Sequence, residues 1–166
     1  MALTGRIGDA RSADSRGAAV SRASIIPDAF LVVSALFVAC VVLQLFLAGL
    51  GVFESAGAFL THRDFGYAFG WLALLMLILV IVGRLPRRQL VMVVGIIVAF
   101  AFQSVFIALR TDAPVIAALH PLNGVLILLL GLEVTRNARA AGQRPSRATD
   151  RTSHAAADRV IADELP

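Results

Sequence analysis

Two histidines of this sequence are each followed by a glycine at the same spacing. Gly66 and then Gly70 follow His62 at intervals of four residues, and Gly124 follows His120 by four. Residues four apart share one face of a helix. Each histidine is therefore followed, one turn further on the same face, by a position that has no side chain. Imidazole is a standard axial ligand of haem iron, and a flat macrocycle needs such room. The pattern predicts one haem b whose iron is bound by His62 and His120.

These histidines lie in or beside stretches that suit lipid. The chain of 166 residues is 58% hydrophobic and has a mean hydropathy of +0.83, which is too apolar for an ordinary soluble domain. About 20 apolar residues cross a bilayer core. Four stretches meet that length, at about 29–52, 57–83, 89–109 and 114–134. The sequence therefore predicts an all-α integral membrane four-helix bundle over residues 28–136, with its first span uncleaved.

Polar segments flank the predicted bundle. Residues 1–27 and 137–166 are rich in small and charged residues, and they are predicted to be largely disordered. All fifteen basic residues are arginine. Four precede the first span, three lie in the link between the second and third spans and six follow the fourth span, so only Arg63 and Arg110 fall on the other side. The positive-inside rule then places both termini in the cytoplasm, as in a multi-pass protein of a bacterial inner membrane. The orientation of the protein in the membrane is enough to explain the excess of arginine, and no nucleic-acid partner is expected.

A few polar residues fall inside the spans. Counted from the cytoplasmic edge of their own spans, Gln44, Gln103 and His120 all lie 15 or 16 residues in. At about 1.5 Å per residue they share one level near the outer face. Polar side chains in lipid turn to the bundle interior, so a polar layer is predicted that also includes Asn123. Such residues can equally serve only as hydrogen bonds between helices.

The relative level of the two histidines depends on how it is counted. From Arg84 at the cytoplasmic edge, His62 is 22 residues away, whereas His120 is 16 residues from its own edge. That difference amounts to a mismatch of about 9 Å. From the outer side, His62 and His120 each follow an acidic residue, Glu54 or Asp112, by eight residues. The second and fourth spans run in one direction and share a diagonal of an up-down bundle, so the second count allows their imidazoles to face each other.

Other residues near the histidines carry expectations of their own. Arg63, next to His62, is expected to pair with a haem propionate near the water boundary. Pro121 removes one backbone N–H and crowds the carbonyl four residues back, so it should bend the fourth span at His120. Glu133 stands three residues before Arg136, a spacing that predicts a surface ion pair.

The order of these elements resembles one half of the haem A synthase family, whose members contain two four-helix bundles. In that family a span with a Gln and a Leu/Gly-rich end precedes a helix that opens with His-Arg and a glycine, as in "LQLFLAGLGVF" and "THRDFGYAFG" here. The third span carries a Gln and the fourth begins with a proline, small apolar residues and a histidine, as in "FQSVFIALRTDAPVIAALHPLNG". The resemblance covers about residues 36–132. It implies a haem held by His62 and His120 near the outer face.

Three departures separate the chain from that family. Phe59 stands where the family has an acidic residue, the outer loop has no cysteine pair, and the chain is half as long. The resemblance therefore implies haem binding without the family's oxidation of a haem methyl group. The chain also resembles an uncharacterised family of short bacterial four-span membrane proteins.

These observations favour a membrane b-type haem protein that serves electron transfer or redox and haem sensing, with a quinone or a redox protein as its partner. A haem-free alternative assigns Gln44, Gln103, His120 and Asn123 to a polar pocket for a small ligand. In a further alternative the chain is an accessory subunit of a larger complex, and a homo-oligomer is left open. The sequence shows no convincing internal repeat. It also has no nucleophile–base pair, phosphate loop or zinc spacing that would mark an enzyme.

Overall fold

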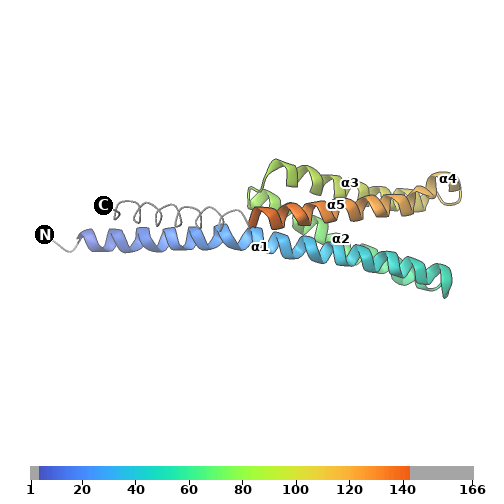
Figure 1. Cartoon of the computed structure of the whole chain (residues 1–166), viewed down its shortest axis with the longest axis horizontal. Coiled ribbons are helices and arrows are strands. Elements are labelled where there is room, and N and C mark those ends of the chain that lie inside the picture. The colour runs from blue at the N-terminus through green and yellow to red at the C-terminus, as the bar shows by residue number, and fades with distance from the viewer. Residues whose placement is uncertain (1–3, 143–166) are drawn as a thin grey trace, which may run out of the picture.

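The computed structural model describes residues 4–142, with side chains described from residue 25 onward. Its helices are α1 (Thr4–Phe53), α2 (Ala58–Val82), α3 (Arg87–Ala108), α4 (Pro114–Ala117) and α5 (Leu119–Gly142) (Figure 1). Four segments are long and apolar enough to cross a membrane, namely Ile25–Phe53, Ala58–Val82, Arg87–Ala108 and Pro114–Gly142. The predicted all-α membrane fold is confirmed. The cytoplasmic placement of the termini stays a prediction.

The first helix begins well before the first span. α1 starts at Thr4, within the segment 1–27 for which the sequence predicts disorder, and it extends past the other helices at its N-terminal end (Figure 1). Alanine and arginine are strong helix formers and are frequent there, so the helix of the span continues outward. At the other terminus α5 ends at Gly142. The rest of the predicted tail, residues 143–166, lies outside the described residues.

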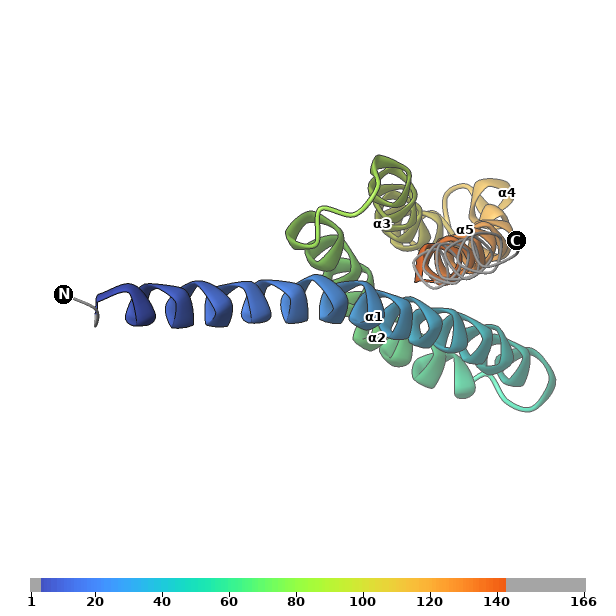
Figure 2. The ribbon, with the colours of Figure 1, turned by 60° about the vertical axis from the view of Figure 1, so that its left-hand side comes forward.

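The helices form two hairpins that pack against each other. α1 pairs with α2, and α3 pairs with α5 by way of the short α4 (Figure 2). α1 also packs on α5 and α2 packs on α3, so α2 and α5 occupy opposite corners of the bundle. This is the diagonal expected for an up-down arrangement. Side chains of α2 and α5 can therefore meet only across the centre.

The buried core fills the middle of the bundle and the end that carries most of the arginines. The rings of Phe37, Phe69 and Phe100 contact one another there, with centroids 5.3 to 6.1 Å apart. Toward the opposite end, the polar side chains at the predicted layer are only half-buried. Packing is thus tighter on the arginine-rich side of the layer. The buried apolar residues are Phe30, Phe37, Val41, Phe69, Ala73, Met76, Val80, Val93, Ile96, Ala99, Ile127 and Val134.

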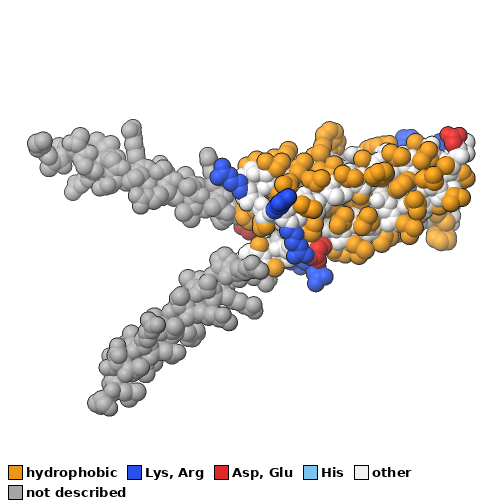
Figure 3. Space-filling model, turned by 90° about the horizontal axis from the view of Figure 1, so that it is seen from above, with side chains coloured by type: hydrophobic (Ala, Val, Ile, Leu, Met, Phe, Trp, Pro, Cys, Tyr) orange, Lys and Arg blue, Asp and Glu red, His pale blue; other side chains and the backbone are white. Residues whose placement is uncertain are grey.

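Charged side chains lie at both ends of the apolar surface, with the larger group of arginines at one end (Figure 3). At that end several of them are paired. There Arg88 of α3 donates to Glu133 of α5 at 2.6 Å and to the Asn137 side-chain oxygen at 3.1 Å. Asn137 also donates to Glu133 at 3.1 Å. The expected pair of Glu133 with Arg136 is therefore wrong. Glu133 is half-buried and turns toward α3, where Arg88 allows it to join two helices, whereas Arg136 is exposed.

The fourth span is interrupted just before His120. α4 ends at Ala117 and α5 begins at Leu119, with Ala118 between them. Pro121 has no N–H to donate to the Ala117 carbonyl, and its ring crowds that oxygen. The bend expected from Pro121 thus takes the form of a break in the helix, which lies one turn before the proline.

Gly131 sets a close approach of α5 to α1. A Cβ added there would lie 3.1 Å from Val38 and 3.3 Å from the Phe37 ring. Gly131→Ala is therefore expected to push the helices apart and to lower the unfolding temperature in detergent. Gly95→Ala is the matched control, because its added Cβ would meet only Leu130, at 3.9 Å, and alanine favours a helix over glycine by about 1 kcal/mol. Equal destabilisation by both substitutions would contradict this packing.

Candidate functional site

The rings of His62 and His120 meet across the centre of the bundle. His62 lies in the first turns of α2 and His120 is the second residue of α5. Their ring centroids are 6.2 Å apart and their planes are inclined by 64°. Both side chains are half-buried. The two histidines thus stand at one level, which agrees with the count from Glu54 and Asp112 and not with the count from the cytoplasmic edge.

Each histidine contacts a main-chain carbonyl of the preceding membrane span, in α1 for His62 and in α3 for His120. Nδ1 of His62 lies 3.1 Å from the Gln44 carbonyl oxygen, and Nδ1 of His120 lies 3.2 Å from the Gln103 carbonyl oxygen. A carbonyl oxygen can only accept, so a hydrogen bond in either contact requires the tautomer protonated at Nδ1, and we assign both rings to that tautomer. In a neutral ring the other nitrogen, Nε2, then carries a lone pair. In the assigned tautomer, Nε2 of both histidines can therefore bind a ligand.

The same glutamines return a second hydrogen bond from their side chains. The Gln44 amide donates to the His62 carbonyl oxygen at 2.7 Å. The Gln103 amide satisfies its neighbours in the orientation in which its nitrogen donates to the His120 carbonyl oxygen at 3.0 Å and its oxygen accepts from the Gly124 N–H at 3.3 Å. In that orientation the amide nitrogen also lies 3.1 Å from Nδ1 of His120, and a hydrogen bond there would require an unprotonated Nδ1. Each glutamine and its histidine are thus joined in both directions, which fixes the register of each hairpin.

The glycines that follow the histidines make room for these amides. A Cβ on Gly66 would lie 2.7 Å from the Gln44 amide nitrogen, and a Cβ on Gly124 would lie 3.3 Å from the Gln103 amide. The sequence led us to expect that these faces were left bare for a macrocycle. The structure shows instead that the side chain of a neighbouring helix uses the space. A lone glycine in a helix cannot indicate which neighbour will fill the gap beside it.

The two hairpins build this contact from the same residue types. Gln44 precedes His62 by 18 residues in one hairpin, and Gln103 precedes His120 by 17 in the other, and each histidine is followed four residues later by a glycine. The spacing differs by one residue, and the residues in between differ too. The repeat that the sequence did not reveal becomes visible once the helices are paired.

The other predicted site residues divide into those inside and those outside this layer. Asn123 lies inside it and donates to the Ala99 carbonyl oxygen of α3 at 2.7 Å. Arg63 is exposed and pairs with its neighbour Asp64 at 2.8 Å, and Gly70 lies further along α2 against the Phe100 ring. The layer therefore contains Gln44, His62, Gly66, Gln103, His120, Asn123 and Gly124, and it excludes Arg63 and Gly70.

The atoms of the layer that remain unpaired can accept hydrogen bonds or bind a metal ion. The Oε1 atom of Gln44 is buried and has no hydrogen-bond partner among the described residues, and in the tautomer assigned above the Nε2 atoms of His62 and His120 are acceptors. Within residues 25–142 no group of three or more His, Cys, Asp and Glu side chains comes together to hold a metal ion. Two imidazoles alone suit a cation or a cofactor that supplies further ligands of its own.

The glutamines are expected to stabilise the bundle by similar amounts. Gln44→Leu and Gln103→Leu should each lower the free energy of unfolding by about 1 kcal/mol, as for other hydrogen bonds between membrane helices. Ser104→Ala, next to Gln103 on an exposed face, should leave it unchanged. Unfolding in mixed micelles measures all three. A loss confined to one glutamine, or one that Ser104→Ala shares, would contradict the paired arrangement.

Comparison with known proteins gives one match. No curated protein and no solved structure matches the chain, and nothing found supports the resemblance to haem A synthases. The match agrees with the expected similarity to an uncharacterised family of membrane proteins, and its stretch includes Gln44, His62 and Gln103. Residues 44–111 are similar to the family described as a family of unknown function, DUF6220.

Proposed function

We propose that this four-span membrane protein binds one b-type haem through His62 and His120 and serves electron transfer or redox and haem sensing. The observation that carries the proposal is the pair of facing imidazoles, 6.2 Å apart, on diagonal helices. Zinc–histidine bonds of about 2.0–2.1 Å give the scale of a metal–imidazole contact, and two rings that share one metal then have centroids roughly 6 Å apart. The separation of the two rings therefore leaves room for one metal ion between them.

The protonation of the rings supports the same assignment. Histidines that bind metals usually donate their other ring N–H to a carbonyl or carboxylate, which fixes the tautomer and orients the ring. His62 and His120 both do so, through Nδ1 and a main-chain carbonyl. A helix contact needs only one such bond per ring. It does not require the two rings to approach each other across the bundle.

A large apolar group has to fit around the histidine pair. A porphyrin supplies four nitrogen ligands when bound, so two protein ligands complete the iron. The glycine faces are occupied by the glutamine amides, so the macrocycle has to use the half-buried remainder of the layer. Phe59 stands edge-on to His62 with its ring centroid 6.4 Å away, and the rings of Phe65 and Phe69 follow on the same helix, 5.3 Å apart. Phe59 thus borders His62, and Phe65 and Phe69 continue the run of aromatic side chains further along α2.

Two histidines would occupy both axial positions of the iron. Electron transfer is then favoured over chemistry that needs an open position. A quinone or a redox protein would be the partner, and the expected location is a bacterial inner membrane, with the site near the outer face. If no haem is bound, the same lone pairs would form the polar pocket for a small ligand.

Optical spectra test this proposal directly. The detergent-purified protein from haem-replete cells should show a Soret band, and sharp α and β bands should appear on reduction with dithionite. Both features should be lost in His62→Ala and in His120→Ala, because either change removes an axial ligand. His154→Ala alters the third histidine of the chain and should retain them. A colourless protein that also fails to take up added haemin would overturn the proposal.

The inclination of the imidazole planes predicts a second spectroscopic feature. Axial imidazoles with parallel planes give ferric haem a rhombic low-spin resonance, whereas strongly inclined planes make the signal highly anisotropic. Because the His62 and His120 planes are inclined by 64°, electron paramagnetic resonance of the oxidised protein should show the highly anisotropic form. A rhombic low-spin signal would mean that the rings rotate on binding, and a high-spin signal would mean that only one histidine binds the iron.

A further inference from the structure

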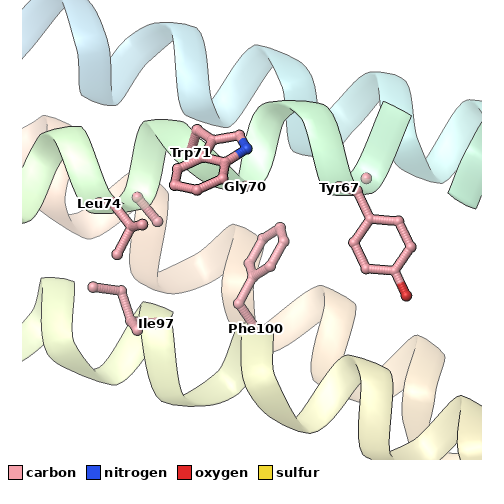
Figure 4. A pocket seen from close by; sticks show the side chains of 8 residues that line it. Tyr67, Gly70, Trp71, Leu74, Ile97 and Phe100 are labelled. Carbon is pink, nitrogen blue, oxygen red and sulfur yellow. The ribbon is translucent and has the colours of Figure 1, made fainter. Parts of the chain in front are cut away.

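A groove on the lipid-facing surface lies between α2 and α3, inward of the histidine pair. Its volume is about 340 Å³, within the range of small-molecule sites. Figure 4 shows Tyr67, Trp71 and Leu74 on α2 across from Ile97 and Phe100 on α3, with Gly70 between them. Gly66 also lines the groove, and it is the residue that touches the Gln44 amide. The groove therefore begins beside the polar layer and continues toward the bilayer centre.

Trp71 is in an unusual position for a tryptophan of a membrane protein. Tryptophan is enriched at the two membrane–water interfaces, whereas Trp71 lies near the middle of α2, which has 25 residues. Its side chain is 71% exposed, and among the described residues its indole N–H has no hydrogen-bond partner. An unpaired donor in hydrocarbon costs several kcal/mol in the worst case, on the order of 4–8 for transfer to an alkane. An acceptor has to reach this depth to satisfy it.

Tyr67 places a second donor at the same groove. It precedes Trp71 by four residues, so the two side chains share a face of α2, and it is 65% exposed. No described residue accepts a hydrogen bond from its hydroxyl group. The phosphate and ester acceptors of membrane lipids lie beyond a hydrocarbon core about 30 Å thick, too far from a group near its centre. The acceptors of the lipid head groups are therefore out of reach of Trp71, which lies at the middle of α2.

We propose that the groove between α2 and α3 binds a membrane-soluble, planar ring that carries carbonyl acceptors and an apolar tail, as in a prenylated quinone. Aromatic and apolar side chains at Trp71, Phe100, Leu74 and Ile97 suit a flat ring, and the two donors suit its carbonyl oxygens. Such a molecule dissolves in the hydrocarbon core and reaches the depth of Trp71. The inference names a partner class for the proposed redox function, although the binding itself does not depend on haem.

The single tryptophan of the chain makes the test specific, since all indole emission comes from Trp71. The full chain in lipid nanodiscs is titrated with a benzoquinone that carries a decyl tail, and quenching of the emission is followed. Leu74→Phe and Leu75→Phe form a matched pair. Both leucines are 40% exposed on α2, but only Leu74 lines the groove. His62→Ala/His120→Ala is titrated as well, to separate quinone binding from haem binding.

The expected quenching is saturable, with an apparent Kd raised at least tenfold by Leu74→Phe and unchanged by Leu75→Phe. Tyr67→Phe should raise the Kd several-fold, because it removes one donor. The double histidine variant should bind the quinone as the parent does, whatever its haem content. Quenching that rises linearly in every variant shows only collision in the bilayer and overturns the proposal. Emission that depends on protein concentration without quinone would also overturn it, because a second copy would then cover Trp71.

Discussion

An imidazole inside a bilayer has to find its hydrogen-bond partner within the protein, because hydrocarbon offers none. His62 and His120 meet this constraint by donating Nδ1–H to the main-chain carbonyls of Gln44 and Gln103. The contacts fix the register of the two hairpins, and they also determine which ring nitrogen stays free. The same pair of hydrogen bonds thus aligns the helices of each hairpin and leaves Nε2 of each ring available for the proposed metal.

The bundle places the two equivalent contacts on opposite corners. Each hairpin carries one glutamine, one histidine and one glycine in the layer, and the histidines come together only because α2 and α5 lie on a diagonal. A group bound between the rings would touch both hairpins at once. Its binding would therefore favour the assembled bundle over separated hairpins, as any ligand that binds only the native arrangement does. This stabilisation by a bound group would matter most around the polar layer, because the helices are packed less tightly there.

The sequence was sufficient for the spans and for the common level of Gln44, Gln103 and His120, because apolar length and helical rise determine both. For His62 the two counts along the sequence disagreed. The sequence did not predict the contact correctly where a residue had more than one possible neighbour. Gly66 and Gly124 were predicted to leave room for a macrocycle, and the glutamine amides use that room. Glu133 was assigned to Arg136 on its own helix, and it pairs with Arg88 of α3. Helical spacing defines a face, whereas the partner of that face depends on how the helices pack.

The groove at Trp71 was missed for a related reason. A tryptophan in an apolar span is unremarkable by composition, and only the fold shows that Trp71 faces lipid near the centre of its helix beside a groove. The groove and the histidine pair are adjacent through Gly66. A membrane-soluble redox partner could therefore approach the proposed haem from the bilayer, without passing through water.

The central claim is that both imidazoles present an unprotonated Nε2 to one shared metal, and nitrogen NMR of the ¹⁵N-histidine-labelled protein tests it most directly. In the haem-free protein, His62 and His120 should both show the tautomer protonated at Nδ1. On addition of ferrous haem, which is diamagnetic when both axial positions are filled by histidine, both Nε2 resonances should shift together while the Nδ1 protons remain. Rings protonated at Nε2 in the haem-free protein, or a shift of only one Nε2, would contradict the account.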